Sequence, residues 1–188
     1  MKKEPDQMTP EELGQLFPIT LTNPNPDWTK FFEIEKKSIE QTLGSENIIR
    51  IEHIGSTAVA NLISKPTIDI LLEIPEDTDN QQIIDRIKSM GYYYISRPEN
   101  PAPHMMFVRG YTKDGYKGQA FHVHVRYAGD WDELYFRDYL RQHPEIASEY
   151  AELKKDLAKE YRNDREGYTD AKTDFVKRII KIVKKKVK

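Results

Sequence analysis

The chain has 188 residues, of which 38% are apolar, and it contains no cysteine. This length suffices to bury one sizeable core, so we expect a single domain, and the lack of cysteine excludes disulfide scaffolds and thiolate metal sites. A net charge of −2, a charged N-terminal stretch and the absence of an apolar run long enough to span a bilayer predict a cytoplasmic protein with no membrane association.

The first predicted elements are an extension, a helix and a strand. Residues 1–18 are polar and carry three prolines, and we interpret them as an N-terminal extension to a domain over residues 19–188. A helix is predicted from Trp28 to about Leu43, where aromatic and aliphatic residues recur at helical spacing. An isoleucine-rich strand is expected over residues 47–54.

That strand ends at a Gly-Ser turn, and residues 56–64 are compatible with a helix. The start of a helix presents unpaired N–H groups to an anion, and glycine lets the backbone approach that anion closely. Hydroxyl groups can add donors, and Lys65 lies just before the next strand. We therefore predict a phosphate-binding group made of Gly55, Ser56, Thr57 and Lys65.

The next strand, predicted from Thr67 to Ile74, carries Asp69 among aliphatic neighbours, on the face that it shares with Thr67, Leu71 and Glu73. A carboxylate so close to a phosphate-binding turn is a candidate metal ligand and catalytic residue. Each feature has a structural alternative: the Gly-Ser turn can be an ordinary capped turn, and Asp69 can be a structural carboxylate. Taken alone, each feature fits its structural alternative as well as a functional role. The order and spacing of the two features favour a functional site.

A helix near residues 79–90 and strands at residues 92–95 and 105–109 follow. Between these strands, three prolines within residues 97–104 predict a loop, which is a candidate cover for the site.

A late strand over residues 119–126 places His122, His124 and Arg126 on one face. Two imidazoles on one strand face can converge on a single ion, and a hydrogen-bonded or solvent-facing pair is the alternative. We predict a metal site of Asp69, His122 and His124, with His53 preferred to Glu52 as a fourth ligand. Such mixed ligands suit manganese or zinc better than magnesium.

From Trp131 onward the pattern becomes helical, with breaks expected at Pro144 and near Asn163. The lysine-rich C-terminal segment, which runs to Lys188, suits the solvated end of a helix better than a nucleic-acid contact, because the rest of the chain is acidic.

Three cations are candidate phosphate contacts outside the turn. Lys172 falls on the apolar face of the last predicted helix, where an amine needs either access to water or an anionic partner. Arg109 and Arg126 lie on predicted strands and can offset ligand charge.

The chain resembles the GrpB family in five separated motifs, which follow one another between Ile19 and Val183: EHIGSTAV, KPTIDI, FHVHV, FRDYLRQHP and YTDAKTDFV. GrpB proteins are similar to polymerase-beta-type nucleotidyltransferases, whose sites carry a G-S turn, a D-x-D strand and a third acid on a later strand. The resemblance implies a mixed α/β fold with about five strands, flanking helices and a helical part from about residue 131. Similar domains occur fused to a dephospho-coenzyme-A kinase.

The resemblance implies a set of site residues, and this sequence contains only some of them. Residues 55–56 match the turn, and Asp69 matches the first acid, but the second acid falls on Leu71, which cannot bind metal. Glu73 on the same face is the available substitute, and a shifted register would put the first acid on Thr67. The later strand carries histidines in place of the third acid, so two-metal chemistry is in doubt.

Together these features predict a nucleotidyltransferase-like protein that binds a nucleotide or another phosphate ligand with a divalent metal, which is manganese, magnesium or zinc. Nucleotidyl transfer to an unknown acceptor is the expected reaction if the protein is an enzyme. The alternatives are a non-catalytic nucleotide- or phosphate-binding module and a metal-dependent hydrolase that uses His122 and His124. The expected partner is a small molecule rather than nucleic acid, and the oligomeric state stays open.

Overall fold

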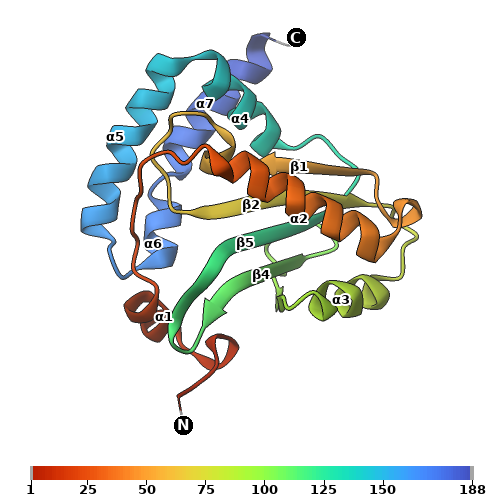
Figure 1. The fold of residues 1–188 in the computed structure, drawn as a ribbon. Helices are drawn as coiled ribbons and strands as arrows, with labels where there is room; N and C mark the ends of the chain where they lie inside the picture. The colour runs from red at the N-terminus through yellow and green to blue at the C-terminus, as the bar shows by residue number, and fades with distance from the viewer. Residues whose placement is uncertain (1, 187–188) are drawn as a thin grey trace.

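The computed structural model describes residues 2–186, which form a mixed sheet of five strands in the order β1-β2-β5-β4-β3 (Figure 1). The strands are β1 (Arg50–Ile54), β2 (Thr67–Ile74), β3 (Tyr93–Ser96), β4 (Met105–Thr112) and β5 (Gly115–Tyr127). Among these described strands, β2 and β5 run parallel and the other neighbouring pairs are antiparallel. The predicted mixed α/β fold with five strands is confirmed.

Helices flank the sheet. The longer helices of the first half are α2 (Asp27–Leu43) and α3 (Asn80–Ser89). The C-terminal helices are α4 (Asp132–Gln142), α5 (Pro144–Glu160), α6 (Arg165–Asp170) and α7 (Thr173–Lys186). In Figure 1, α2 crosses in front of the sheet and α5 and α6 lie at its left end. Within residues 2–186, no helix is both long and apolar enough to cross a bilayer.

One face of the sheet packs against α2 and α3 and forms the main core. On β2, every second residue from Ile68 to Ile74 is completely buried there. The other contributors to this core include Trp28, Phe32, Ile39, Leu43, Ile83, Ile87, Phe107, Val123 and Val125. Burial of one such side chain stabilises the fold by roughly 1.5–3 kcal/mol, and a slip of one residue would turn the whole set outward. The core therefore determines which residues of β2 and β5 face the other way.

Residues 2–18 fold onto the domain. They contain a 3-10 turn, η1 (Pro5–Gln7), and α1 (Pro10–Leu16), whose start is closed by a reciprocal capping box between Thr9 and Glu12. Phe17 is completely buried against a small cluster from β4 and β5. This apolar contact holds the polar segment against the end of the sheet.

Four predicted elements differ from the structure. The helix expected over residues 56–64 is replaced by a single 3-10 turn, η3 (Ser56–Ala58), because the backbone of Ser64 instead pairs with Thr22 in an isolated bridge. Another 3-10 turn, η2 (Ser45–Asn47), shortens the predicted first strand at its start. Two strands are longer than predicted: β4 and β5 continue until they meet in a hairpin, in which Thr112 pairs with Gly115.

Glu73 on β2 joins three parts of the fold. Its carboxylate, which is 3% exposed, accepts hydrogen bonds from Arg50 Nε at 2.8 Å and Nη2 at 2.6 Å. It also accepts from the Trp131 indole N–H at 2.5 Å and from the Gly129 backbone N–H at 3.3 Å. The side chain therefore ties β1 and β2 to the connection between β5 and α4.

We predict that Glu73→Ala lowers the free energy of unfolding by about 1–3 kcal/mol, because it leaves the donors of Trp131 and Gly129 without an acceptor. Urea unfolding of the variant measures the loss. Glu76→Ala, at an exposed position shortly after β2, is the control and should change stability by no more than about 0.5 kcal/mol. Equal stability of the two variants would contradict the anchoring role.

Candidate functional site

The face of the sheet opposite α2 brings an acid and two histidines together. In the parallel register of β2 and β5, Asp69 lies directly across from His122, and His124 comes two residues later on the same face. One ligand atom from each residue lies within 4.8 Å of the other two. The three residues could therefore hold one metal ion, as the sequence predicted.

The three side chains also interact with one another. His122 Nδ1 and His124 Nε2 each lie 3.3 Å from Oδ1 of Asp69. Burial alone would raise the pKa of the Asp69 carboxyl, but hydrogen bonds from both histidines and their charges outweigh it and hold the pKa well below its usual range. Burial lowers the pKa of His122, although Asp69 opposes the shift. An ionised carboxylate beside a neutral imidazole is the state that binds metal.

Tyr111 fixes the orientation of His122 from the neighbouring strand. Its hydroxyl lies 2.8 Å from His122 Nε2, which leaves Nδ1 facing Asp69. A bulge at Gly110, where φ is +92°, shifts the register of β4 between Arg109 and Tyr111. Sequence reasoning missed Tyr111, because strict alternation along β4 does not reveal which face a bulged residue takes.

Gly55 lets the backbone approach Asp69. It adopts φ of +72° and ψ of −173°, and an added Cβ would lie 2.6 Å from Asp69 Oδ2. Any larger residue would combine backbone strain with a collision against the carboxylate. The glycine of the Gly-Ser turn is therefore required by its contact with the candidate metal ligand.

The predicted phosphate-binding turn lines a cavity of about 670 Å³ together with the Asp-His-His group. The turn residues and Lys65 all border it. Thr57 also has a structural role, since its hydroxyl donates to the Thr67 carbonyl at 3.2 Å. Because η3 is a single turn, the helix-dipole argument for anion binding does not apply to it, and the positive charge of the cavity comes from side chains instead.

Two predicted site residues lie elsewhere. His53 faces the core, because Ile54 rather than His53 is opposite Asp69; its ring stacks on Phe32 at 4.8 Å, and burial lowers its pKa to about 4. Arg109 also faces α2, where it forms an ion pair with Glu35. Both side chains lie on the α2 face of the sheet, opposite the cluster. The predictions of His53 as a fourth metal ligand and of Arg109 as a phosphate contact were therefore wrong.

Neither the expected position of the second acid nor its substitute adds a carboxylate to the cluster. Leu71 is fully buried and cannot bind a cation, and the Glu73 carboxylate is occupied by Arg50 and Trp131. Among the residues that the structure describes, the group therefore supplies one carboxylate and two imidazoles. This set matches one metal ion rather than two.

The remaining predicted cations do border the cavity: Lys65, Arg126 and Lys172. Lys172 lies in the turn between α6 and α7 and not on the face of one continuous helix. Two further cations, Lys154 and Arg165, were missed by sequence reasoning, because each looks like an ordinary helix residue until α5 and α6 are placed beside the sheet. The proline-rich loop also contributes, since Arg97, Glu99 and Asn100 line the same cavity.

Comparisons with known proteins agree on one family. Residues 18–182 match the family described as GrpB protein. The chain is 42% identical over 158 residues to a UPF0157 protein of Pseudomonas aeruginosa, over 83% of this chain and 64% of that protein, so it spans less than two thirds of that relative. It is 34% identical over 165 residues to the glutamate-rich protein GrpB of Alkalihalophilus pseudofirmus, over 86% and 94% of the two chains.

A solved structure agrees with this assignment. The crystal structure of the conserved protein GrpB from Enterococcus faecalis is similar to this chain with a TM-score of 0.77 and 32% identity, and the match covers 89% of this chain and 99% of that one. The likeness therefore extends over most of the chain.

We predict that Gly55→Ala weakens metal binding and lowers the free energy of unfolding by more than the roughly 1–3 kcal/mol expected for backbone strain alone. Gly118→Ala is a matched control, because Gly118 has a similar φ of +70° but no atom within 4 Å of the added Cβ. Calorimetry with Mn²⁺ or Zn²⁺ and urea unfolding compare the two variants. The same effects in both would show that the approach to Asp69 is unimportant.

We expect Tyr111→Phe to keep the fold and to weaken metal binding by about 10–100-fold, the range found when a partner of a metal-bound histidine is removed. Isothermal calorimetry with Zn²⁺ measures the affinity. Tyr116→Phe, on the same hairpin and 46% exposed, is the control and should leave the affinity unchanged. An unaltered affinity in Tyr111→Phe would refute the orienting role.

Proposed function

The chain belongs to the GrpB family, and from this premise we propose that Asp69, His122 and His124 bind one divalent metal ion, which in turn holds a small phosphate-bearing ligand. The supporting observation is the convergence of three ligand atoms within 4.8 Å in a cavity lined by cations. A volume of about 670 Å³ suits a small molecule, since ligand sites commonly measure roughly 300–1,000 Å³.

The chemistry of the ligands favours zinc or manganese. Two imidazoles and one carboxylate are softer than the all-oxygen octahedron that magnesium prefers. Three protein ligands leave at least one coordination position for an oxygen of the bound molecule or for water. Tyr111 supports the arrangement, because it engages the nitrogen of His122 that does not face the cluster.

The electrostatics of the cavity favour phosphate. Six lysine and arginine side chains line it: Lys65, Arg97, Arg126, Lys154, Arg165 and Lys172. Its acidic residues other than Asp69 are exposed. Because the cations surround a cavity and do not form an open surface stripe, a small anionic molecule fits the site better than nucleic acid.

Nucleotidyl transfer is the reaction we propose. The metal and the lysines would hold the triphosphate of a nucleotide while a hydroxyl of an acceptor attacks the α-phosphorus and pyrophosphate leaves. With Leu71 and Glu73 outside the cluster, the reaction would use one ion for charge stabilisation and the protein's cations in place of a second ion.

Metal-dependent hydrolysis is a second candidate, favoured by the open coordination position. Three protein ligands with a bound water are typical of catalytic zinc sites, in which the metal generates a hydroxide nucleophile near neutral pH. Product analysis with a nucleoside triphosphate separates the candidates. Transfer attaches the nucleotide to an added acceptor, hydrolysis releases products without one, and a binding module binds without turnover.

We predict that Asp69→Asn and the double variant His122→Ala/His124→Ala reduce Zn²⁺ or Mn²⁺ affinity by at least about 100-fold, the upper end of the loss caused by removing outer-shell partners alone. Asp69→Asn should stay folded, because the amide has nearly the same shape as the carboxylate. Calorimetry and thermal unfolding measure both properties.

Asp170→Asn is the matched control, because Asp170 borders the same cavity, is exposed and lies outside the ligand cluster. It should bind metal as the wild type does. Wild-type metal affinity in the double histidine variant would refute the metal site, and an unfolded Asp69→Asn protein would identify Asp69 as a structural carboxylate.

A further inference from the structure

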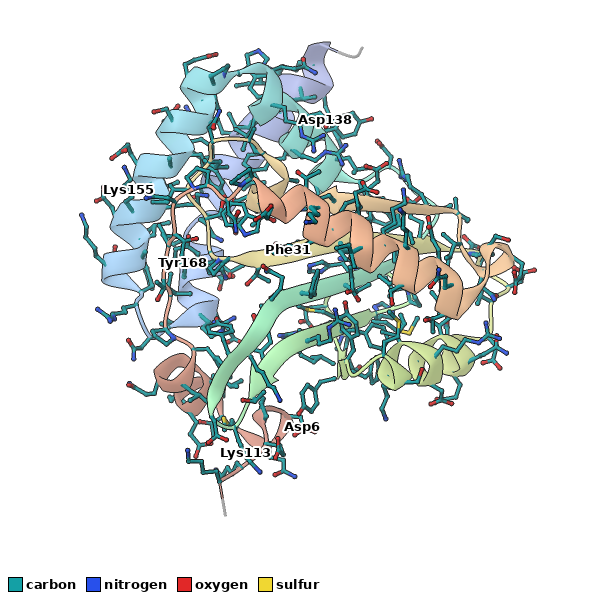
Figure 2. The ribbon with its side chains drawn as sticks, in the orientation of Figure 1. Asp6, Phe31, Lys113, Asp138, Lys155 and Tyr168 are labelled. Carbon is teal, nitrogen blue, oxygen red and sulfur yellow. The ribbon has the colours of Figure 1, made fainter. Side chains whose placement is uncertain are left out.

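Three lysines from distant parts of the chain converge at the start of β2. Lys65 precedes β2, Lys154 lies on α5 and Lys172 lies between α6 and α7, and all three line the cavity. Tyr168 of α6 stands among them, and Figure 2 shows it near the left end of β2. Its ring centre lies 5.4 Å from Lys65 Nζ and 4.2 Å from Lys172 Nζ.

These lysines have no carboxylate to neutralise them. Within residues 2–186, none of the three amines has an acidic oxygen within 4.0 Å. Lys154 donates to the backbone carbonyl of Ile63, which satisfies one of its three donors. The exposed acids around the cavity, Glu99, Glu133, Glu166 and Asp170, do not form ion pairs with them. Lys154 is buried and Lys65 and Lys172 are half-buried. Cations that lose water without gaining an anionic partner are costly, and they are expected where a ligand supplies the counter-charge.

Burial shifts the pKa of each of the three lysines. Burial, aided by repulsion from Lys172, lowers the pKa of both Lys65 and Lys154 to about 7. Burial lowers the pKa of Lys172 to about 8, although Asp69 opposes the shift. An anion placed among them would stabilise the protonated form of all three amines.

A buried hydroxyl provides an independent indication that the cavity can bind a ligand. Tyr168 is 1% exposed, and within the described part of the chain its hydroxyl has no hydrogen-bond partner. Buried tyrosine hydroxyl groups ordinarily find a partner, because leaving one unpaired is unfavourable. A ligand oxygen in the cavity that Tyr168 lines would satisfy this donor.

We propose that Lys65, Lys154, Lys172 and Tyr168 form a binding site for a chain of two or more phosphoryl groups. This inference deepens the proposed function and rests on it, because both place the ligand in the same cavity. The lysine site would bind the anion, whereas Asp69, His122 and His124 would bind the metal. One phosphate group carries about −1.5 to −2 charges at pH 7, which cannot match three lysines and a divalent ion together. A di- or triphosphate chain can reach from the three lysines to a metal ion held by Asp69, His122 and His124.

The test measures binding of inorganic tripolyphosphate and orthophosphate to the full chain by calorimetry, with EDTA present so that no metal contributes. We expect tripolyphosphate to bind at least about tenfold more tightly than orthophosphate. Lys154→Met and Lys172→Met should each weaken its binding about tenfold or more, as expected for loss of one charge-assisted hydrogen bond. Equal affinity for the two anions would overturn the proposal.

The controls separate this site from general positive charge. Lys155→Met removes a neighbouring lysine of α5 whose side chain is 44% exposed and points away from the sheet in Figure 2. It should bind tripolyphosphate as the wild type does. Tyr168→Phe removes only a hydroxyl that has no partner, so it should fold normally and still bind more weakly. If Lys155→Met lost as much affinity for tripolyphosphate as Lys154→Met, the proposal of a defined lysine site would be refuted.

Failure here is distinguishable from failure of the metal proposal. Asp69→Asn should retain tripolyphosphate binding in EDTA, and Lys154→Met should retain Zn²⁺ binding without anion. Loss of tripolyphosphate binding in Asp69→Asn would overturn the separation of the two subsites. Comparison of ATP with tripolyphosphate then identifies the source of the chain: tighter binding of ATP assigns a nucleoside triphosphate, and equal or weaker binding assigns an inorganic polyphosphate.

Discussion

The parallel pairing of β2 with β5 is the constraint on which the candidate site depends. It sets Asp69 beside His122 although more than fifty residues separate them, and it brings His124 within reach of the same carboxylate. The pairing is held by the apolar face, where alternate residues from Ile68 to Ile74 are buried under α2 and α3. Because a strand has two faces, the burial of one face determines that the acid and the histidines share the other.

Buried charge has two different uses in this molecule. On the helix-covered face, Glu35 is paired with Arg109 and accepts a hydrogen bond from Tyr92, so that its charge is satisfied within the protein. Near the edge of the other face, Glu73 is saturated by Arg50 and the segment that leads to α4. Such completed networks stabilise and leave nothing for a ligand. The cavity differs, because Lys154 and Tyr168 are buried and Lys65 and Lys172 are half-buried there, and within residues 2–186 none of these lysines forms an ion pair and the Tyr168 hydroxyl has no hydrogen-bond partner.

The C-terminal helices turn a sheet face into a cavity. Lys154 of α5 reaches the carbonyl of Ile63, and Arg141 of α4 donates to the carbonyl of Ala58, so two helices are fastened to the loop between β1 and β2. These contacts hold the lysines of the helical layer close to the turn that presses against Asp69. The sheet thus supplies the candidate metal ligands, and the C-terminal helical layer adds Lys154, Arg165 and Lys172 to the cavity. The candidate site therefore draws on both parts of the fold.

Sequence alone determined the elements with strong local signals. The alternation of aliphatic residues gave β2 its predicted bounds of Thr67 and Ile74, and the same alternation placed His122 and His124 on one face. The motif order identified the family, and the acid at Asp69 pointed to the candidate metal cluster with His122 and His124. These inferences succeed because side-chain period and turn chemistry are properties of short segments.

Only the tertiary structure decided the rest. The face of His53 depends on where β1 ends and which residue is opposite Asp69, and the role of Tyr111 depends on a bulge. The failed helix after Ser56 reflects a bridge between Ser64 and a segment some forty residues earlier in the chain. Lys154 joins the site because α5 packs beside the sheet. Contacts between distant segments decide these features, and no local pattern encodes which helix residue will face a strand that precedes it by eighty positions.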